Sequence, residues 1–193
     1  MSRQTLFALP NVLTYLRILA VPAVVIAFYF PGHTARWVAF FIFAFAAITD
    51  FFDGYLARAW KQQSSLGKML DPIADKLLVS VCLLILTWKG TIGSVSVIAA
   101  LIILCREILV SGLREFLAAL QVSVPVTKLA KWKTTTQLLA LGFLLVGPAG
   151  NIILPKTTEI GITLLWISAI LTIYTGYDYF KASIGHLVNE EQT

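Results

Sequence analysis

Apolar residues fill the chain in six long segments, each separated from the next by charged or turn-forming residues. By number they span roughly 11–30, 36–60, 66–88, 93–120, 129–146 and 159–184. A helix of about 20 residues crosses the ~30 Å hydrocarbon core of a bilayer, and it satisfies its own backbone hydrogen bonds there. The pattern predicts an all-α membrane protein, a six-transmembrane-helix bundle that forms one domain over residues 1–193.

The composition agrees with a bilayer as the solvent. Hydrophobic residues make up 58% of the chain and charged residues only 13%, whereas soluble domains carry roughly a quarter charged residues. The net charge of +5 is explained by basic residues that flank the apolar segments, so we expect no nucleic-acid partner. Cys82 and Cys105 lack metal-site spacing, and we expect both to be small buried hydrophobes.

Basic residues are distributed unevenly between the two ends of the predicted bundle. Six spans place both termini on one side of the membrane. That side would hold eight basic residues: Arg3, Arg58, Lys61, Lys68, Lys128, Lys131, Lys133 and Lys181. The other side would hold three, Arg36, Lys89 and Lys156. The positive-inside rule therefore places both termini in the cytoplasm.

The second and third segments are each apolar over only about half of their length. The clean stretches, 37–49 and 77–88, are about a dozen residues each, or roughly 18 Å of helix. The other halves carry Asp50 and Asp53 in one segment and Asp71 and Asp75 in the next. By the predicted orientation, four carboxylates meet at one depth near the cytoplasmic interface, on helical stripes that face each other across an antiparallel pair.

Four ionised carboxylates within a membrane need compensating positive charge. Oxygen-rich carboxylate sites suit Mg²⁺, Mn²⁺ or Ca²⁺ rather than zinc, so we expect one divalent ion or a close pair. Gly54, Ala57 and Gly67 lie on the same stripes. They either admit a ligand close to the backbone or serve helix packing, and Arg58 either binds a phosphate or pairs with an aspartate.

The arrangement Asp50-x2-Asp53-Gly54-x2-Ala57-Arg58-x8-Gly67-x3-Asp71-x3-Asp75 resembles the signature of the CDP-alcohol phosphatidyltransferases at every fixed position. The resemblance implies a six-helix membrane fold, commonly a homodimer, and divalent metals bound by the four aspartates. It also implies that Asp50, Gly54, Ala57, Arg58 and Gly67 line the CDP site and that Asp75 is the general base. Metals would neutralise the pyrophosphate and stabilise the leaving CMP, while Asp75 accepts the proton of the attacking hydroxyl.

The alcohol acceptor has to be inferred from the remaining basic residues. Arg106 and Arg114 lie within the fourth segment, and Lys128, Lys131 and Lys133 gather at the start of the fifth. Glu107 and Arg114, seven residues apart, share a helical face and offer a pairing that needs no ligand, and the lysines fit a plain cytoplasmic loop charge. Together these groups also fit a basic pocket for an alcohol that carries a phosphate.

Softer matches cover most of the chain. They are Pro10-Asn11-x2-Thr14-x2-Arg17, Arg106-Glu107-x6-Arg114-Glu115-Phe116 and Lys131-Trp132-Lys133-Thr134-Thr135-x-Gln137. They resemble the bacterial branch of the family that makes phosphatidylglycerophosphate. This resemblance implies CDP-diacylglycerol and sn-glycerol 3-phosphate as substrates, Arg106, Arg114 and Lys131 at the acceptor phosphate, and a multi-pass place in a bacterial inner membrane with the site facing the cytoplasm.

Two other functions stay open on the sequence. A sibling enzyme of the cardiolipin synthase type would keep the aspartates and use another acceptor. A divalent-cation transporter would also carry acids within the membrane, although the inverted repeats common in transporters are not visible here.

Overall fold

The structure, a computed structural model, describes residues 9–59, 65–119, 121 and 128–190. All regular structure in these ranges is helical, as predicted. The elements are α2 (Leu9–Tyr29), α3 (His33–Ala59), α4 (Ser65–Trp88), α5 (Ser96–Ala119), α6 (Lys128–Val146), the 3₁₀ helix η1 (Gly147–Ile152) and α7 (Thr157–Glu190). The six α-helices match the six apolar segments to within a few residues, except that α7 continues to Glu190, beyond the predicted end at 184.

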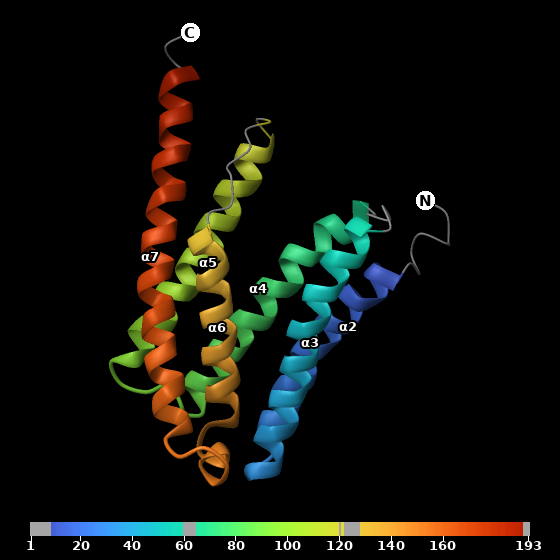
Figure 1. The fold of residues 1–193 in the computed structure, drawn as a ribbon, viewed down its shortest axis with the longest axis vertical. Coiled ribbons are helices and arrows are strands. Elements are labelled where there is room, and N and C mark those ends of the chain that lie inside the picture. Colours follow the sequence, from blue (N-terminus) through green and yellow to red (C-terminus); the bar gives the residue numbers. More distant parts are fainter. Residues whose placement is uncertain (1–8, 60–64, 120, 122–127, 191–193) are drawn as a thin grey trace.

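Consecutive helices run in alternating directions, so α2 begins and α7 finishes toward the same end of the bundle (Figure 1). The C-terminal half of α3, the N-terminal half of α4, the C-terminal half of α5 and the N-terminal half of α6 therefore share that end. Helix α2 packs against both α3 and α4, and α6 packs against α3, α4 and α7. Helix α5 packs against α4 and α7.

Four helices of the described structure are long and apolar enough to cross a membrane, within α2, α5, α6 with η1, and α7. Helices α3 and α4 have 27 and 24 residues, which is also long enough to span. Their charged halves set them apart, as the sequence predicts. With several helices of this kind, the chain is a multi-pass membrane protein.

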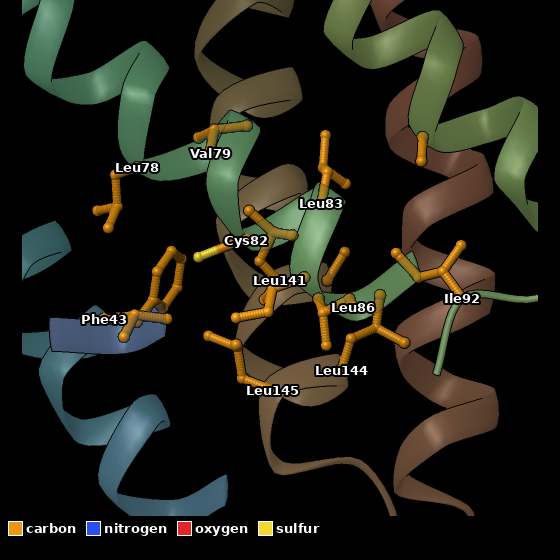
Figure 2. Packing of buried hydrophobic residues seen from close by; sticks show 14 of the residues in the cluster. Phe43, Leu78, Val79, Cys82, Leu83, Leu86, Ile92, Leu141, Leu144 and Leu145 are labelled. Carbon is orange, nitrogen blue, oxygen red and sulfur yellow. The ribbon is translucent and has the colours of Figure 1, made fainter. Parts of the chain in front are cut away.

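The helices pack around an apolar core that includes Phe43 of α3, Cys82 and Leu86 of α4, and Leu141 and Leu144 of α6 (Figure 2). Large apolar side chains also cover the outside. On α3 they recur at helical spacing, as Val38, Phe41, Phe45 and Ile48, and lipid is their natural environment. The expectation for the two cysteines is half correct: Cys82 is buried, but Cys105 is exposed on α5, because a membrane helix turns apolar residues outward as well as inward.

Arg36 connects α3 to the end of α6 and to the segment after α4, at the end of the bundle opposite to the acidic residues. Its guanidinium donates hydrogen bonds to the carbonyls of Leu144 and Leu145 at 3.5 and 3.4 Å and to Thr91 Oγ1 at 2.9 Å. It thereby satisfies carbonyl groups at the end of α6, which have no partner within the helix. Gly147 follows with φ +50°, and a Cβ atom there would lie 2.6 Å from Arg36 Nη1. Glycine is thus required for the turn and for the close approach of the arginine.

Candidate active site

Helix α2 brings two polar side chains to the acidic residues. Thr14 Oγ1 donates a hydrogen bond of 2.5 Å to Asp71 Oδ1. Arg17 Nη1 lies 2.8 Å from Asp50 Oδ1 and 3.0 Å from Asp75 Oδ1. The arginine side chain is fully buried, whereas the two carboxylates are about half exposed. One guanidinium therefore links α3 to α4 and balances part of their negative charge.

The three aspartates whose side chains the structure describes lie near one another. Asp50 is close enough to Asp71 for their charges to interact and close enough to Asp75 for their carboxyl groups to share a hydrogen bond. The facing of the α3 and α4 stripes that the sequence predicts agrees with a direct contact between the carboxyl groups of Asp50 and Asp75, and Arg17 Nη1 lies against both of them. The long-range packing of α2, which no local pattern reveals, determines this position of Arg17.

The remaining residues of the motif are only partly described. Asp53, Gly54, Ala57 and Arg58 lie within α3, but their side chains are outside the described part of the structure. Gly67 is buried near the start of α4. Among the described side chains, no group of three or more His, Cys, Asp or Glu residues is close enough to hold a metal ion. The donor set nevertheless suits a hard divalent cation, because it is all carboxylate and Arg17 balances only one of its negative charges.

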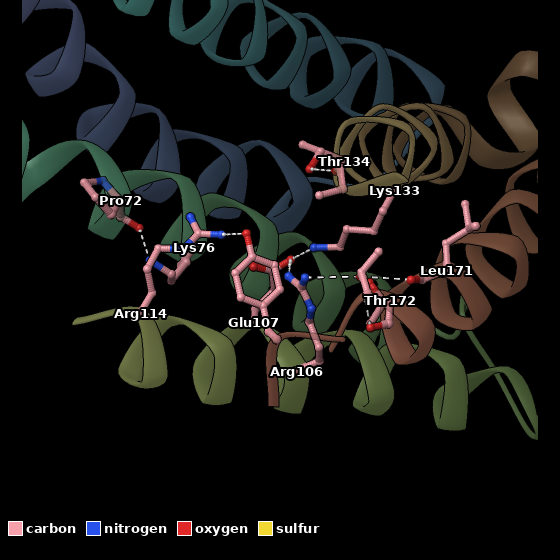
Figure 3. Close-up of polar contacts among 12 residues, drawn as sticks. Pro72, Lys76, Arg106, Glu107, Arg114, Lys133, Thr134, Leu171 and Thr172 are labelled. Atoms are coloured by element: carbon pink, nitrogen blue, oxygen red, sulfur yellow. Dashed lines mark hydrogen bonds and ion pairs between the residues drawn. The ribbon is translucent and has the colours of Figure 1, made fainter. Parts of the chain in front are cut away.

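A second polar cluster lies at the same end of the bundle, between α5, α6 and α7 (Figure 3). Lys133 of α6 is buried and pairs with Glu107 of α5. Arg106 Nη1 lies 3.7 Å from the same Glu107 oxygen. Arg106, Arg114 and Lys133 are close enough for their charges to repel one another. The cluster thus contains three cations and one described carboxylate, Glu107, which Arg106 and Lys133 share, so its described charges are positive in sum and suited to bind an anion.

The structure changes the interpretation of two predicted contacts. Arg114 does not depend on Glu107: its Nη2 donates to the Tyr179 hydroxyl at 3.1 Å, and Glu107 pairs with Lys133 instead. The side chain of Lys131 is exposed. Lys131 and Lys133 are two residues apart, or about 200° around a helix, so they lie on nearly opposite faces of α6. Of these two lysines, Lys133 is the one that enters the cluster with Arg106 and Arg114.

Sequence reasoning missed Thr14, Arg17, Thr175 and Tyr179 as contributors to these clusters, although it quoted Thr14 and Arg17 within a softer match. The sequence does contain a signal for the residues of α2 and another for those of α7. An arginine in an apolar segment requires a buried partner, and the acids of the neighbouring segments were the natural candidates. On α7, hydroxyl-bearing residues recur at helical spacing among isoleucines and leucines.

A helical bundle in the membrane, with clustered carboxylates and a cluster of cations at the same end, defines a multi-pass membrane protein equipped to handle phosphorylated substrates. Residues 7–174 match the CDP-alcohol phosphatidyltransferase family. The chain belongs to this family.

Curated relatives are similar over nearly the whole length. A Rickettsia bellii protein named CDP-diacylglycerol–glycerol-3-phosphate 3-phosphatidyltransferase is 52% identical over 174 residues, covering 90% of this chain and 94% of the relative. Proteins of the same name from Cereibacter sphaeroides and Salmonella typhimurium are 41% and 39% identical, covering 96% and 95% of this chain and 99% of each relative.

Proposed function

We propose that the protein transfers the phosphatidyl group of CDP-diacylglycerol to sn-glycerol 3-phosphate, yielding phosphatidylglycerophosphate and CMP. The names of the relatives support this reaction. The observation that carries the choice of acceptor is the cluster of Arg106, Arg114 and Lys133, in which three positive charges lie near a single described carboxylate, Glu107. An acceptor with a phosphomonoester would supply the missing negative charge, whereas a neutral alcohol would leave the cations without compensation.

The aspartates supply the other half of the proposed site. Asp50, Asp53, Asp71 and Asp75 would hold Mg²⁺ or Mn²⁺, which neutralises the pyrophosphate and the charge on the leaving CMP. Arg17 and Thr14 hold three of these carboxylates in place by direct contacts. Asp50, Gly54, Ala57, Arg58 and Gly67 are proposed to line the CDP site, following the family motif.

In the reaction, Asp75 would accept the proton of the acceptor hydroxyl. A bond forms between the acceptor oxygen and the lipid-side phosphorus, and the bond from that phosphorus to the bridging oxygen breaks as CMP leaves. The cation cluster would hold the phosphate of the acceptor while its hydroxyl reaches the reacting phosphorus. Helix α4, which carries Asp75, packs against both α5 and α6, so the base and the acceptor pocket are built on neighbouring elements.

The membrane location and the oligomeric state are part of the same proposal. We propose a bacterial inner membrane with the site toward the cytoplasm, where glycerol 3-phosphate and CMP are soluble and the acyl chains stay in lipid. A single membrane domain and a homodimer, the common state in this family, complete the proposal.

The test is CMP release by purified protein in detergent with CDP-diacylglycerol and Mg²⁺ or Mn²⁺. Glycerol 3-phosphate, phosphatidylglycerol, inositol and serine are compared as acceptors. We expect turnover with glycerol 3-phosphate alone. Turnover with phosphatidylglycerol would instead support a cardiolipin synthase type, and no CMP release with any acceptor would overturn the transferase assignment and favour ion transport.

A further inference from the structure

One face of α7 is polar although the helix crosses the membrane. Ser168, Thr172, Thr175 and Tyr179 follow one another at intervals of four, three and four residues, which places them on one face, and all four are buried. The hydroxyls of Ser168 and Thr172 have no hydrogen-bond partner among the described residues. Buried polar side chains in a spanning helix serve either helix association or a functional site.

Tyr179 contacts Arg114 in two ways. Its hydroxyl accepts a hydrogen bond of 3.1 Å from Arg114 Nη2, and the guanidinium carbon lies 5.2 Å from the centre of the ring. A long arginine side chain has considerable rotamer freedom, so two contacts with one buried ring restrict where its charge can lie. The ring attracts the cation, and the hydroxyl sets the direction of the guanidinium.

Thr175 and Gly176, about one helical turn before Tyr179, restrict the position of the Arg106 side chain. Thr175 Oγ1 accepts a hydrogen bond of 3.3 Å from Arg106 Nη2 and donates its own proton to the Leu171 carbonyl at 2.9 Å. That donation leaves the oxygen lone pairs directed at the arginine. A Cβ atom at Gly176 would lie 3.3 Å from Arg106 Cγ, so the missing side chain lets Arg106 lie against the α7 backbone.

Helix association alone does not explain these partners. The partners of Thr175 and Tyr179 are two arginines whose charges repel each other, whereas neutral partners would join two helices without that repulsion. Arg106 Nε is also buried and has no hydrogen-bond partner among the described residues. Nε lies on the same edge of the guanidinium as Nη2, toward Gly176 of α7, so α7 holds that edge, while Nη1 is directed at Glu107.

We propose that Tyr179 and Thr175 are positioning residues that hold Arg114 and Arg106 at the spacing needed to bind the phosphate of the acceptor. They act through the arginines and do not touch the reacting atoms. The proposal rests on the assigned function, because it specifies how the acceptor pocket of that reaction is built.

The test compares steady-state kinetics of Tyr179→Phe and Thr175→Val with those of the wild type in detergent, varying glycerol 3-phosphate and CDP-diacylglycerol separately. We expect each variant to raise the KM for glycerol 3-phosphate about tenfold, or ~1.4 kcal/mol. The KM for CDP-diacylglycerol and the kcat at saturating acceptor should stay within about twofold of wild type. Thr175→Ser, which keeps the hydroxyl, should restore the KM for the acceptor.

Tyr177→Phe is the matched control, because Tyr177 lies on the exposed face of the same helix and loses the same hydroxyl. It should behave as wild type. An unchanged KM for glycerol 3-phosphate in both test variants would overturn the positioning role while leaving the proposed function intact. A lower kcat together with equal increases in the KM values of both substrates would also overturn it, because such a change indicates a general structural defect. Wild-type protein that ignores glycerol 3-phosphate would instead overturn the proposed function itself.

Discussion

Replacement of Arg17 by methionine tests whether the arginine balances the charge of the acidic site. Methionine keeps most of the apolar stem, so the change removes mainly the guanidinium and its contacts of 2.8 and 3.0 Å to Asp50 and Asp75. Removing one partner of a buried ion pair typically destabilises a protein by about 3–5 kcal/mol. The two carboxylates are 41% and 47% exposed, so water compensates in part, and we expect a loss of about 2–3 kcal/mol.

The assay is thermal unfolding of the purified protein in detergent, with and without Mn²⁺. For a chain of this size, 1 kcal/mol corresponds to roughly 2–4 °C, so the metal-free variant should unfold about 5–10 °C below wild type. A divalent cation at the aspartates supplies positive charge that the variant lacks. Saturating Mn²⁺ should therefore remove more than half of the difference.

Arg36→Met is the matched control for this prediction. Arg36 is also a partly buried arginine that joins helices, but its hydrogen bonds go to Leu144, Leu145 and Thr91 at the opposite end of the bundle. Its loss should lower the unfolding temperature by the same amount with and without Mn²⁺. If the deficit of Arg17→Met were equally insensitive to Mn²⁺, the arginine would be a packing residue and its role as a counter-ion would be refuted.

Three further changes test separate parts of the structure. Asp75→Asn should reduce kcat by at least about a hundredfold while CDP-diacylglycerol still binds, as measured by equilibrium binding; near-normal turnover would exclude Asp75 as the base. Lys133→Met should raise the KM for glycerol 3-phosphate about tenfold or more, whereas Lys131→Met should change it less than twofold, and the reverse order would place the pocket on the other face of α6. Gly147→Ala should destabilise the protein by about 1–3 kcal/mol, because the alanine would adopt φ +50° and meet Arg36 at 2.6 Å; an unchanged unfolding temperature would contradict the tight fit.

The helices and the aspartate motif could be predicted from the sequence because both depend on local spacing. Apolar runs of spanning length define the helices, and the intervals between Asp50 and Asp75 alone place the acids on helical stripes. What the sequence does not define is how these stripes meet. Arg17 contacts Asp75 across 58 positions, and only the packing of α2 against α3 and α4 brings them together.

The residues of the proposed acceptor pocket could likewise be predicted only in part from the sequence. Basic residues near 106, 114 and 131–133 were evident, but the choice between Lys131 and Lys133 depends on which face of α6 turns inward. Polar residues predominate in the first half of this helix and apolar residues in the second, without a preferred side, so its pattern indicates no buried face. Lys133 is the buried residue because α6 is enclosed by α3, α4 and α7.

The most direct test of the central claim compares glycerol 3-phosphate with glycerol as the acceptor for the wild-type protein, since the two differ only in the phosphate. The quantity measured is kcat/KM for CMP release with CDP-diacylglycerol and Mn²⁺. If Arg106, Arg114 and Lys133 recognise the phosphate of the acceptor, glycerol 3-phosphate should be favoured by at least about a thousandfold, as expected when a site built for a charged group meets an analogue that lacks it. Comparable kcat/KM values for the two alcohols would contradict the account, because the cation cluster would then have no part in choosing the acceptor.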